Sequence, residues 1–329
     1  MNKCIFSTLN KMDPLFADIF LSLMKVCEVL ECSLPRWLEK FEKITFPTVC
    51  IPLPDEVLEY LREDGSLVLP TECNEETYDG KEADYEDFGD VDWDESDVSD
   101  TTVTVSHQRS FPEFSRELSG HLSRYGGNVF IKLNWSSPKD ATWMVLNRDL
   151  KCSSLSQIYL LLKSSDFIAH DLSQPFKDCE DASGESLTEV SYSLVVRRWE
   201  DINPGTEFRC WISGGSLVCL CQRDVTNFYP YMQREAESIK QDILTFFSEH
   251  IRYSTGYLKG HSTSIQPFVV RGKFALSRFV MDVVRPRKDE VVLVDFNPWG
   301  ETTDSLMFSW QELSDGHPSD HVEFRLIFS

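Results

Sequence analysis

Two side chains that can offer oxygen ligands, Asp295 and Asn297, stand two positions apart at the end of an apolar run, residues 291–296. The run is rich in valine and predicts a β-strand. Side chains two apart on a strand point to the same face of a sheet, so both oxygens can reach one point in space. A second apolar run, residues 278–284, predicts a strand that pairs antiparallel with the first across a short loop.

This predicted hairpin brings a third oxygen ligand to the same face. If its loop is centred between residues 288 and 289, Asp282 pairs opposite Asp295, and Val283 pairs opposite Val294. Residues that pair directly in this way share a face of the sheet. The spacing therefore predicts two carboxylates facing each other, with an amide beside them.

Carboxylates that face each other across a ladder repel, and in a partly buried place one of them is driven to bind a proton. A hard divalent cation removes this conflict. Magnesium takes oxygen ligands at about 2.0–2.1 Å and usually shares its shell with phosphates and water. Asp282, Asp295 and Asn297 therefore predict a magnesium site that also meets a phosphorylated ligand.

The alternative is an edge hairpin whose acidic residues face water. Aromatic and proline residues next to the pair, Phe296, Pro298 and Trp299, favour a walled cleft over an open surface. Glu301 and Asp304 follow closely. Each is either a further ligand or an ordinary surface carboxylate.

A nucleotide needs cations for its phosphates and an apolar slot for its base. Lys132 lies in the apolar strand 129–133, where a lysine must find an anion or reach out to water. The turn-rich segment 134–141 could lie over phosphates and donate backbone N–H groups. An outward-facing lysine and an ordinary turn are the alternatives. No Walker-type or GxGxxG motif occurs in the sequence.

Further charged groups mark other strand ends. The strand 195–199 ends in two arginines and a tryptophan, and such a segment can offer backbone groups to an adenine edge. Arg209 alternates with apolar neighbours on a predicted central strand. A buried arginine needs a partner, which could be a phosphate or Glu207. Arg223, just beyond the next strand, is either another charged group of the site or part of a surface turn.

The chain has 329 residues and a formal net charge of -22. This balance argues against a general nucleic-acid or anionic-membrane binder. The ten cysteines include no CxxC pair, and those within apolar runs, such as Cys152 and Cys210, suit a reduced core. We therefore expect a cytoplasmic protein, and a monomer, with no direct nucleic-acid or membrane partner.

The remaining pattern predicts how these groups are positioned. A helix closed by two glycines is expected over 112–125, and capping-box spacing at Ser154 and Gln157 opens another through residue 163. Strands at 192–199, 207–212 and 217–222 precede a long amphipathic helix, residues 233–250. The order of elements predicts an α+β protein with antiparallel sheets and helices on one side.

Five motifs in this order resemble the cell division cycle protein 123 family. They are Lys132-Leu133-Asn134-Trp135-Ser136, Lys163-Ser164-Ser165-Asp166-Phe167, Glu207-Phe208-Arg209-Cys210, Gln222-Arg223-Asp224 and Asp295-Phe296-Asn297-Pro298. The resemblance covers residues 32–312, and the acidic segment 71–106 sits where that family also has a linker.

The resemblance implies an ATP-grasp fold that binds ATP with magnesium. It also implies an assembly chaperone for eukaryotic translation initiation factor two, acting on the gamma subunit. The residues expected to line the nucleotide are Lys132, Trp135, Ser137, Lys139, Arg197, Arg198, Trp199, Glu200, Arg209 and Asp224. Those expected to hold magnesium are again Asp282, Asp295 and Asn297.

The expected organisation combines composition and residue pattern with this resemblance. It comprises an N-terminal helical extension at 1–31, a segment of the partner-binding lobe at 32–70, a disordered acidic linker at 71–106, an ATP-grasp-like core at 107–312 with an insertion at 254–272, and a shortened C-terminal tail at 313–329.

Two functions from different classes remain open. One is an assembly factor in which ATP favours a closed state that grips a partner. The other is an ATP-grasp ligase that joins a carboxylate to an amine, which needs a polar acceptor pocket that we could not identify from the residues. The absence of an HRD-type loop argues against a protein kinase. We expect the assembly factor rather than a turnover enzyme.

Overall fold

The computed structural model describes residues 24–63, 65, 67–75, 108–182, 190–252, 255–258, 266–269, 274–315 and 322–328. Most of the predicted N-terminal extension, the acidic linker beyond residue 75 and most of the 254–272 insertion lie outside these residues. Only the short strands β6 (Thr255–Leu258) and β7 (Gln266–Val269), an antiparallel pair, belong to that insertion.

The chain divides into two compact units, each built from segments that are not contiguous. Unit 1 comprises Met1–Cys50, Gln174–Val195 and Glu200–Ser329. Unit 2 comprises Ile51–Ser173 and Val196–Trp199. The border at residue 50 runs through the expected segment 32–70, and the expected core 107–312 contributes to both units.

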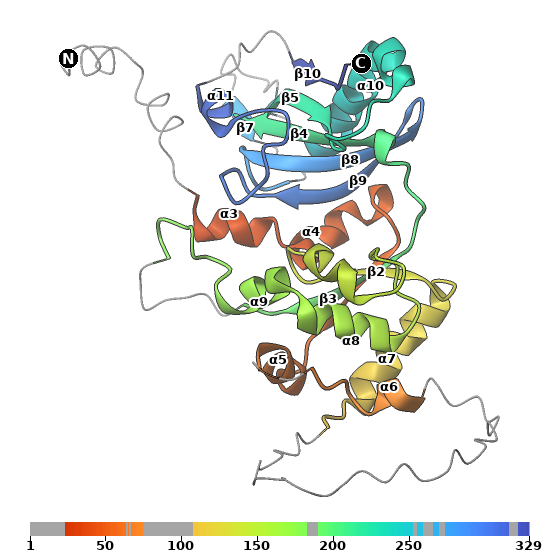
Figure 1. The fold of residues 1–329 in the computed structure, drawn as a ribbon. Helices are drawn as coiled ribbons and strands as arrows, with labels where there is room; N and C mark the ends of the chain where they lie inside the picture. The colour runs from red at the N-terminus through yellow and green to blue at the C-terminus, as the bar shows by residue number, and fades with distance from the viewer. Residues whose placement is uncertain are drawn as a thin grey trace, which may run out of the picture. The chain divides into compact units, whose positions relative to one another are not determined.

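A five-stranded sheet forms the centre of unit 1, in the order β10-β5-β4-β8-β9 (Figure 1). Its strands are β4 (Glu207–Ser213), β5 (Ser216–Gln222), β8 (Phe279–Arg287), β9 (Glu290–Asn297) and β10 (Glu323–Arg325). All neighbours are antiparallel except β10, which runs parallel to β5. Gly214 and Gly215, both at positive φ, make the β4–β5 turn that the sequence predicts.

The β8–β9 hairpin confirms the predicted pairing of Asp282 with Asp295. The expectation for the next pair is wrong, because Val283 lies opposite Leu293 and not opposite Val294. A register shift between Asp282 and Val283 accounts for the difference. Such a bulge leaves an extra residue on one strand and changes the direction of nearby side chains.

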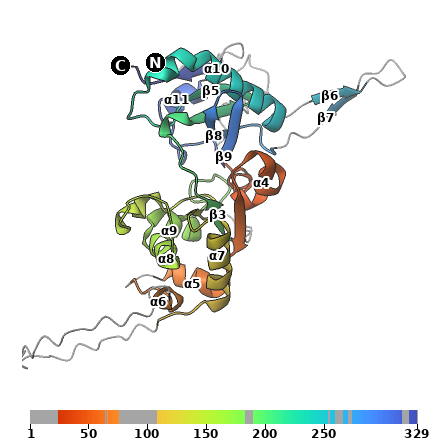
Figure 2. The ribbon, with the colours of Figure 1, turned by 90° about the vertical axis from the view of Figure 1, so that its right-hand side faces the viewer.

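Helix α10 (Pro230–Phe246) packs on this sheet in unit 1 (Figures 1 and 2). It begins three residues earlier than predicted, because Pro230 occupies its first turn, where a proline needs no N–H partner. It continues into a π-helical turn, η4 (Phe247–Ile251). On β8, the buried Arg285 bonds Glu235 and Asp242 of α10 at 2.8 Å each, which fixes the helix against the sheet.

The other helices among the described residues of unit 1 are short. They are α3 (Val26–Glu31), α4 (Leu34–Phe41), the 3-10 turns η1 (Glu42–Ile44) and η3 (Pro204–Thr206), and α11 (Trp310–Ser314). Trp37 and Phe41 of α4 pack edge-on against Phe296 of β9, each with ring centroids 5.3 Å apart. Phe274 stacks on the same ring at 3.9 Å. This aromatic cluster anchors the end of β9, where two of the predicted ligands lie.

Unit 2 contains helices that pack on one another around a small core. They are α5 (Asp55–Arg62), α6 (Glu72–Glu75), α7 (Pro112–Arg124), α8 (Leu155–Ser164), α9 (Asp166–Ser173) and the 3-10 helix η2 (Lys139–Met144). The predicted cap of α8 is present, with Ser154 Oγ accepting the Gln157 N–H at 3.2 Å. Tyr60, Phe111 and Tyr159 form a ring cluster between α5, α7 and α8.

A three-stranded sheet has the order β1-β3-β2, with β1 (Thr48–Pro52), β3 (Ser193–Arg198) and β2 (Val129–Lys132). The border between the two units falls within β1 and β3. Cys152 and Cys210 are buried free thiols, as predicted. Among the helices described, none is long and apolar enough to cross a membrane.

Candidate functional site

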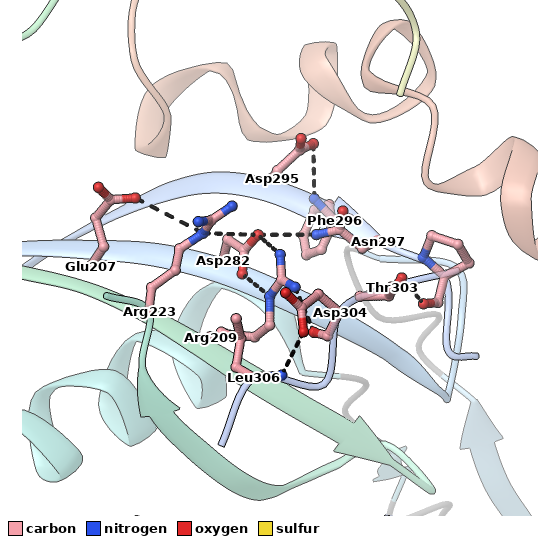
Figure 3. A network of polar contacts seen from close by, with 11 residues as sticks. Glu207, Arg209, Arg223, Asp282, Asp295, Phe296, Asn297, Thr303, Asp304 and Leu306 are labelled. Carbon is pink, nitrogen blue, oxygen red and sulfur yellow. Dashed lines mark hydrogen bonds and ion pairs between the residues drawn. The ribbon is translucent and has the colours of Figure 1, made fainter. Parts of the chain in front are cut away.

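A buried ion pair between Arg209 and Asp282 forms the centre of the candidate site (Figure 3). Arg209 Nε donates to Asp282 Oδ1 at 2.8 Å, and Arg209 Nη2 donates to Asp282 Oδ2 at 2.7 Å. The two residues are direct cross-strand partners on β4 and β8, so the sheet itself aligns the fork of the guanidinium with the carboxylate. Arg209 is 5% exposed and Asp282 3%, so water does little to screen them.

The pair shifts both titrations toward the charged forms. Burial by itself raises the pKa of Asp282, but the Arg209 charge and its hydrogen bonds outweigh burial and hold that pKa below the ordinary value of 3.8. Burial by itself lowers the pKa of Arg209, and Asp282 reverses this and raises it. The sequence allowed a phosphate or Glu207 as the partner of Arg209. The partner is Asp282.

Two more side chains complete the network around Asp282. Asn297 Nδ2 donates to Asp282 Oδ2 at 3.1 Å, so its carbonyl oxygen points elsewhere. Arg223 Nε lies 3.8 Å from the same Oδ2 and 4.0 Å from Glu207 Oε2. Burial raises the pKa of Glu207 and outweighs the opposing charge of Arg223. Arg223, with 39% of its side chain exposed, is the solvent-facing cation of the network.

Asp295 is brought to the register position that the sequence predicts, but its side chain takes another direction. Its Oδ1 accepts the backbone N–H of Phe296 at 3.0 Å, and Figure 3 shows the carboxylate turned away from Asp282 and Asn297. The register shift next to Asp282 is a physical reason for this direction. Within the described part of the chain, no three His, Cys, Asp or Glu side chains cluster as a metal site.

The residues that flank this hairpin are accounted for by packing and loop geometry. Phe296 belongs to the aromatic cluster, and Trp299 belongs to an apolar cluster with Trp211 and Phe308. Asp304 contributes through its backbone, because its carbonyl oxygen accepts Arg209 Nη1 at 2.7 Å. The Asp304 carboxylate accepts the Leu306 N–H, and Glu301 is exposed.

In unit 2, Lys132 is buried, which excludes the outward-facing alternative. It acts electrostatically on Asp171, a buried carboxylate of α9. Both Asp171 oxygens accept hydrogen bonds at 2.8 Å from Ser136, one from its N–H and one from its hydroxyl. Burial raises the pKa of Asp171, against these bonds and the Lys132 charge. Asp171 of α9 therefore fixes the position of the loop after β2 through Ser136.

The other predicted nucleotide residues of unit 2 lie near the same sheet. Arg197 is buried in β3, while Arg198 at its end is exposed. Trp199 is half-buried, with the Lys151 ammonium 5.9 Å from its ring centre. Trp135 and Ser137 are half-buried, and Lys139 is exposed. The Lys139 ammonium lies 5.3 Å from the Phe167 ring centre.

Besides Arg209, two predicted nucleotide residues belong to unit 1. Glu200 is half-buried just after β3. Asp224 closes a turn, because its carboxylate accepts hydrogen bonds from Thr226, Asn227 and the Tyr229 hydroxyl. Burial opposes these bonds, yet they hold the pKa of Asp224 below its ordinary value.

Sequence reasoning missed one residue and the role of another here. Asp171 is three positions from Ile168 and shares its buried helix face, a spacing that could have marked it. Asp304 was a candidate for its carboxylate, but the sequence carries no signal for the role of its carbonyl oxygen as the acceptor of Arg209.

The Arg209–Asp282 pair predicts how stability depends on pH. Because the pKa of Asp282 is lowered in the folded state, its contribution is fully present above about pH 4. It is lost as the pH falls through the lowered pKa. We expect the difference in unfolding free energy between the wild type and Asp282→Asn to shrink as the pH drops below 3.8. Urea titrations at a series of pH values measure it, and a pH-independent difference contradicts the assignment.

The comparison with solved structures defines the class of protein. The structure of Cdc123 from Schizosaccharomyces pombe matches with a TM-score of 0.69 and 29% identity, covering 94% of this chain and 100% of that one. A C-terminally truncated form of the same protein also matches at a TM-score of 0.69. The protein therefore has an ATP-grasp-like α+β fold, with antiparallel sheets and flanking helices as predicted.

The sequence comparisons then place the chain in a family. The D123 family model matches residues 37–329. A protein of Xenopus laevis is 39% identical over 290 residues, which cover 88% of this chain and 78% of the relative. A protein of Danio rerio is 40% identical over 293 residues, 89% of this chain and 77% of the relative. Both are named translation initiation factor eIF2 assembly protein. The chain belongs to the D123 family, the family of Cdc123.

Proposed function

We propose that this protein assists the assembly of translation initiation factor eIF2, that it binds ATP with magnesium, and that it acts through the gamma subunit. The observation that carries the proposal is the match, along nearly nine-tenths of the chain, to relatives named for eIF2 assembly. The ATP-grasp-like fold supports the nucleotide part. The gamma subunit comes from the family resemblance alone.

The donor set at the β8–β9 hairpin fits magnesium in kind. Two carboxylates and an amide oxygen are hard ligands, and Asp282, Asp295 and Asn297 would hold an ion that supplies positive charge for phosphate groups. Asp282 would share its carboxylate between the ion and Arg209. Asn297 now donates its Nδ2 to Asp282, so its side-chain amide would have to turn to present the oxygen to a cation held by Asp282. Asp295 would have to rotate its side chain from its bond with the Phe296 N–H.

Each unit offers basic side chains that could bind phosphate groups of a nucleotide. Arg209 and Arg223 supply positive charge in unit 1, and Arg223 is the more exposed of the two. Lys132 and Arg197 supply it in unit 2, both within the three-stranded sheet. Variants made in one unit at a time test the contribution of that unit to nucleotide binding.

The metal assignment predicts that Asp295→Ala weakens the binding of magnesium-ATP by at least tenfold while the protein stays folded. Its carboxylate is half-buried and its bond to the Phe296 N–H is local, so little of the fold depends on it. Calorimetric titration of the full chain with ATP, with and without magnesium, measures the effect. Asp178→Ala, an exposed carboxylate of the same unit, is the charge-matched control. Equal affinities for the two variants contradict the assignment.

The assembly role is tested on the same protein. The purified chain is mixed with the eIF2 gamma subunit, with and without magnesium-ATP, and capture and nucleotide turnover are both followed. We expect capture without appreciable turnover. Rapid turnover that needs a small carboxylic acid and an amine, with no capture of the subunit, would favour a ligase.

A further inference from the structure

The loop after β9, residues 298–309, is held from two sides, and we call it the site loop. From the candidate site, Arg209 Nη1 donates to the Asp304 carbonyl oxygen at 2.7 Å. From the C-terminal strand β10, Arg325 Nη1 donates to the Met307 carbonyl oxygen at 2.7 Å. The two carbonyls that receive these arginines are only three residues apart.

Arg325 is fixed by its own surroundings. It pairs with Cys221 in the parallel β10–β5 ladder, which sets where its side chain starts. Its guanidinium lies 4.0 Å from the Phe308 ring centre and bonds Glu312 Oε1 at 3.0 Å and Glu323 Oε1 at 2.7 Å. The Arg325 hydrogen bond, with those from Ser309, lowers the pKa of Glu312 to about 2. Such a clamped guanidinium can impose a position on the loop.

Between the two held carbonyls, the backbone is strained. Leu306 has φ +52, a left-handed conformation that is costly for a branched side chain. Its N–H donates to Asp304 Oδ1 at 2.9 Å. Strained residues of this kind persist only where the surrounding contacts dictate them. The contacts around this turn include Arg209 at Asp304, Arg325 at Met307, and the apolar cluster with Trp211 and Phe308 against which Leu306 packs.

The C-terminal segment also reaches the site by a second path. Gln222, which is fully buried at the end of β5, accepts the Ile327 N–H on its Oε1 at 3.3 Å. Its Nε2 donates to the Asp224 and Asn227 carbonyls. The next residue is Arg223, which faces Asp282. The C-terminal segment therefore contacts the site loop at Met307 and the residue that precedes Arg223.

We propose that Arg325 is a positioning residue for the Arg209–Asp282 pair, and that the C-terminal strand and the candidate site are energetically coupled through the site loop. In this proposal, the hydrogen bond from Arg325 fixes the Met307 carbonyl and thereby the strained turn at Leu306. The turn then places the Asp304 carbonyl where it accepts Arg209. Only one part of the inference, the effect of Arg325 on nucleotide binding, rests on the proposed function. Coupling is reciprocal. A ligand that binds Arg209 should therefore change the stability of β10 by the same factor by which β10 changes the affinity for that ligand.

The first test needs no nucleotide. Arg325→Gln removes the clamp, and Arg325→Lys keeps a charge that can still reach the Met307 carbonyl. Amide hydrogen exchange at Leu306 should accelerate by about tenfold in Arg325→Gln and be partly restored in Arg325→Lys. Arg287→Gln is the matched control, since that arginine lies exposed on the same sheet with its own ion pair.

The coupling itself is measured by a double-mutant cycle. Arg209→Lys keeps a charge opposite Asp282 but loses the fork that also reaches Asp304. The double variant Arg209→Lys with Arg325→Gln should lose clearly less melting temperature than the sum of the losses of the two single variants, because both substitutions release the same loop. Additive losses, together with unchanged Leu306 exchange, overturn the inference.

The second test adds magnesium-ATP and separates this inference from the proposed function. Arg325→Gln should bind about tenfold more weakly than Arg287→Gln, although Arg325 touches no predicted ligand of the nucleotide. If the wild type itself binds no nucleotide, the nucleotide part of the proposed function fails, while the exchange and the cycle still decide the coupling. If the wild type binds and the two variants bind equally, the coupling to the ligand is refuted.

Discussion

Replacing Asp282 with alanine is expected to lower the free energy of unfolding by about 3–5 kcal/mol. The substitution leaves the Arg209 guanidinium buried with its charge uncompensated, since Asp282 accepts two of its hydrogen bonds. Breaking a buried pair from one side costs more than the pair contributes as a whole, because the remaining ion keeps its desolvation penalty. Urea unfolding at neutral pH, followed by fluorescence and circular dichroism, measures the loss.

Two controls separate this electrostatic effect from general damage to the hairpin. Asp295→Ala, one strand away in the same register pair, should cost less than about 1 kcal/mol, as expected for a half-buried group with a local bond. Replacing both partners together, Arg209→Met with Asp282→Leu, should recover most of the stability. A double variant as unstable as Asp282→Ala alone would show that charge compensation is not the cause.

The sequence was sufficient for the β8–β9 hairpin. Two valine-rich runs and a short polar loop indicate it, and the pairing of Asp282 with Asp295 follows from counting residues. The bulge that moves Leu293 opposite Val283 leaves no mark in the alternation of side chains. It also re-aims Asp295, so the direction of one proposed ligand could not be obtained from period-two reasoning.

The partners of buried charged side chains were the second feature that could not be predicted from the sequence. The sequence indicated that Lys132 and Arg209 need anions, because each lies among apolar neighbours on a strand. It could not say which anions, since Asp282 is 73 residues from Arg209 and Asp171 is on a different element from Lys132. Such pairings depend on the order of strands and helices in space, and periodicity within one element does not specify that order.

The C-terminal strand shows a related limit. Three residues, Glu323–Arg325, are too few to mark a strand from their pattern alone, and their pairing with β5 is parallel in a sheet that is otherwise antiparallel. What they contribute is specific, because Arg325 and the Ile327 N–H hold residues next to the candidate site. A segment that reads as a tail in the sequence therefore takes part in positioning chemistry-bearing side chains.

Phe296→Ala is the other change with a large expected effect, about 3–5 kcal/mol of stability. The ring is 2% exposed and touches Trp37, Phe41, Phe274 and Phe279, so its removal leaves a cavity that four rigid rings cannot fill. Phe296 also stands between Asp295 and Asn297 on β9. The same packing that stabilises unit 1 therefore fixes the end of the strand from which both side chains project.

This double role gives the Phe296 prediction a second readout. Phe296→Leu restores much of the volume, and should regain most of the stability lost in Phe296→Ala. Because it lacks the edge-on ring contacts that hold the strand end, it should still bind magnesium-ATP more weakly than wild type. Phe328→Ala, at a side chain that is 74% exposed in the same unit, should change neither quantity. If Phe296→Leu binds like wild type, the aromatic cluster stabilises the fold without positioning the proposed ligands.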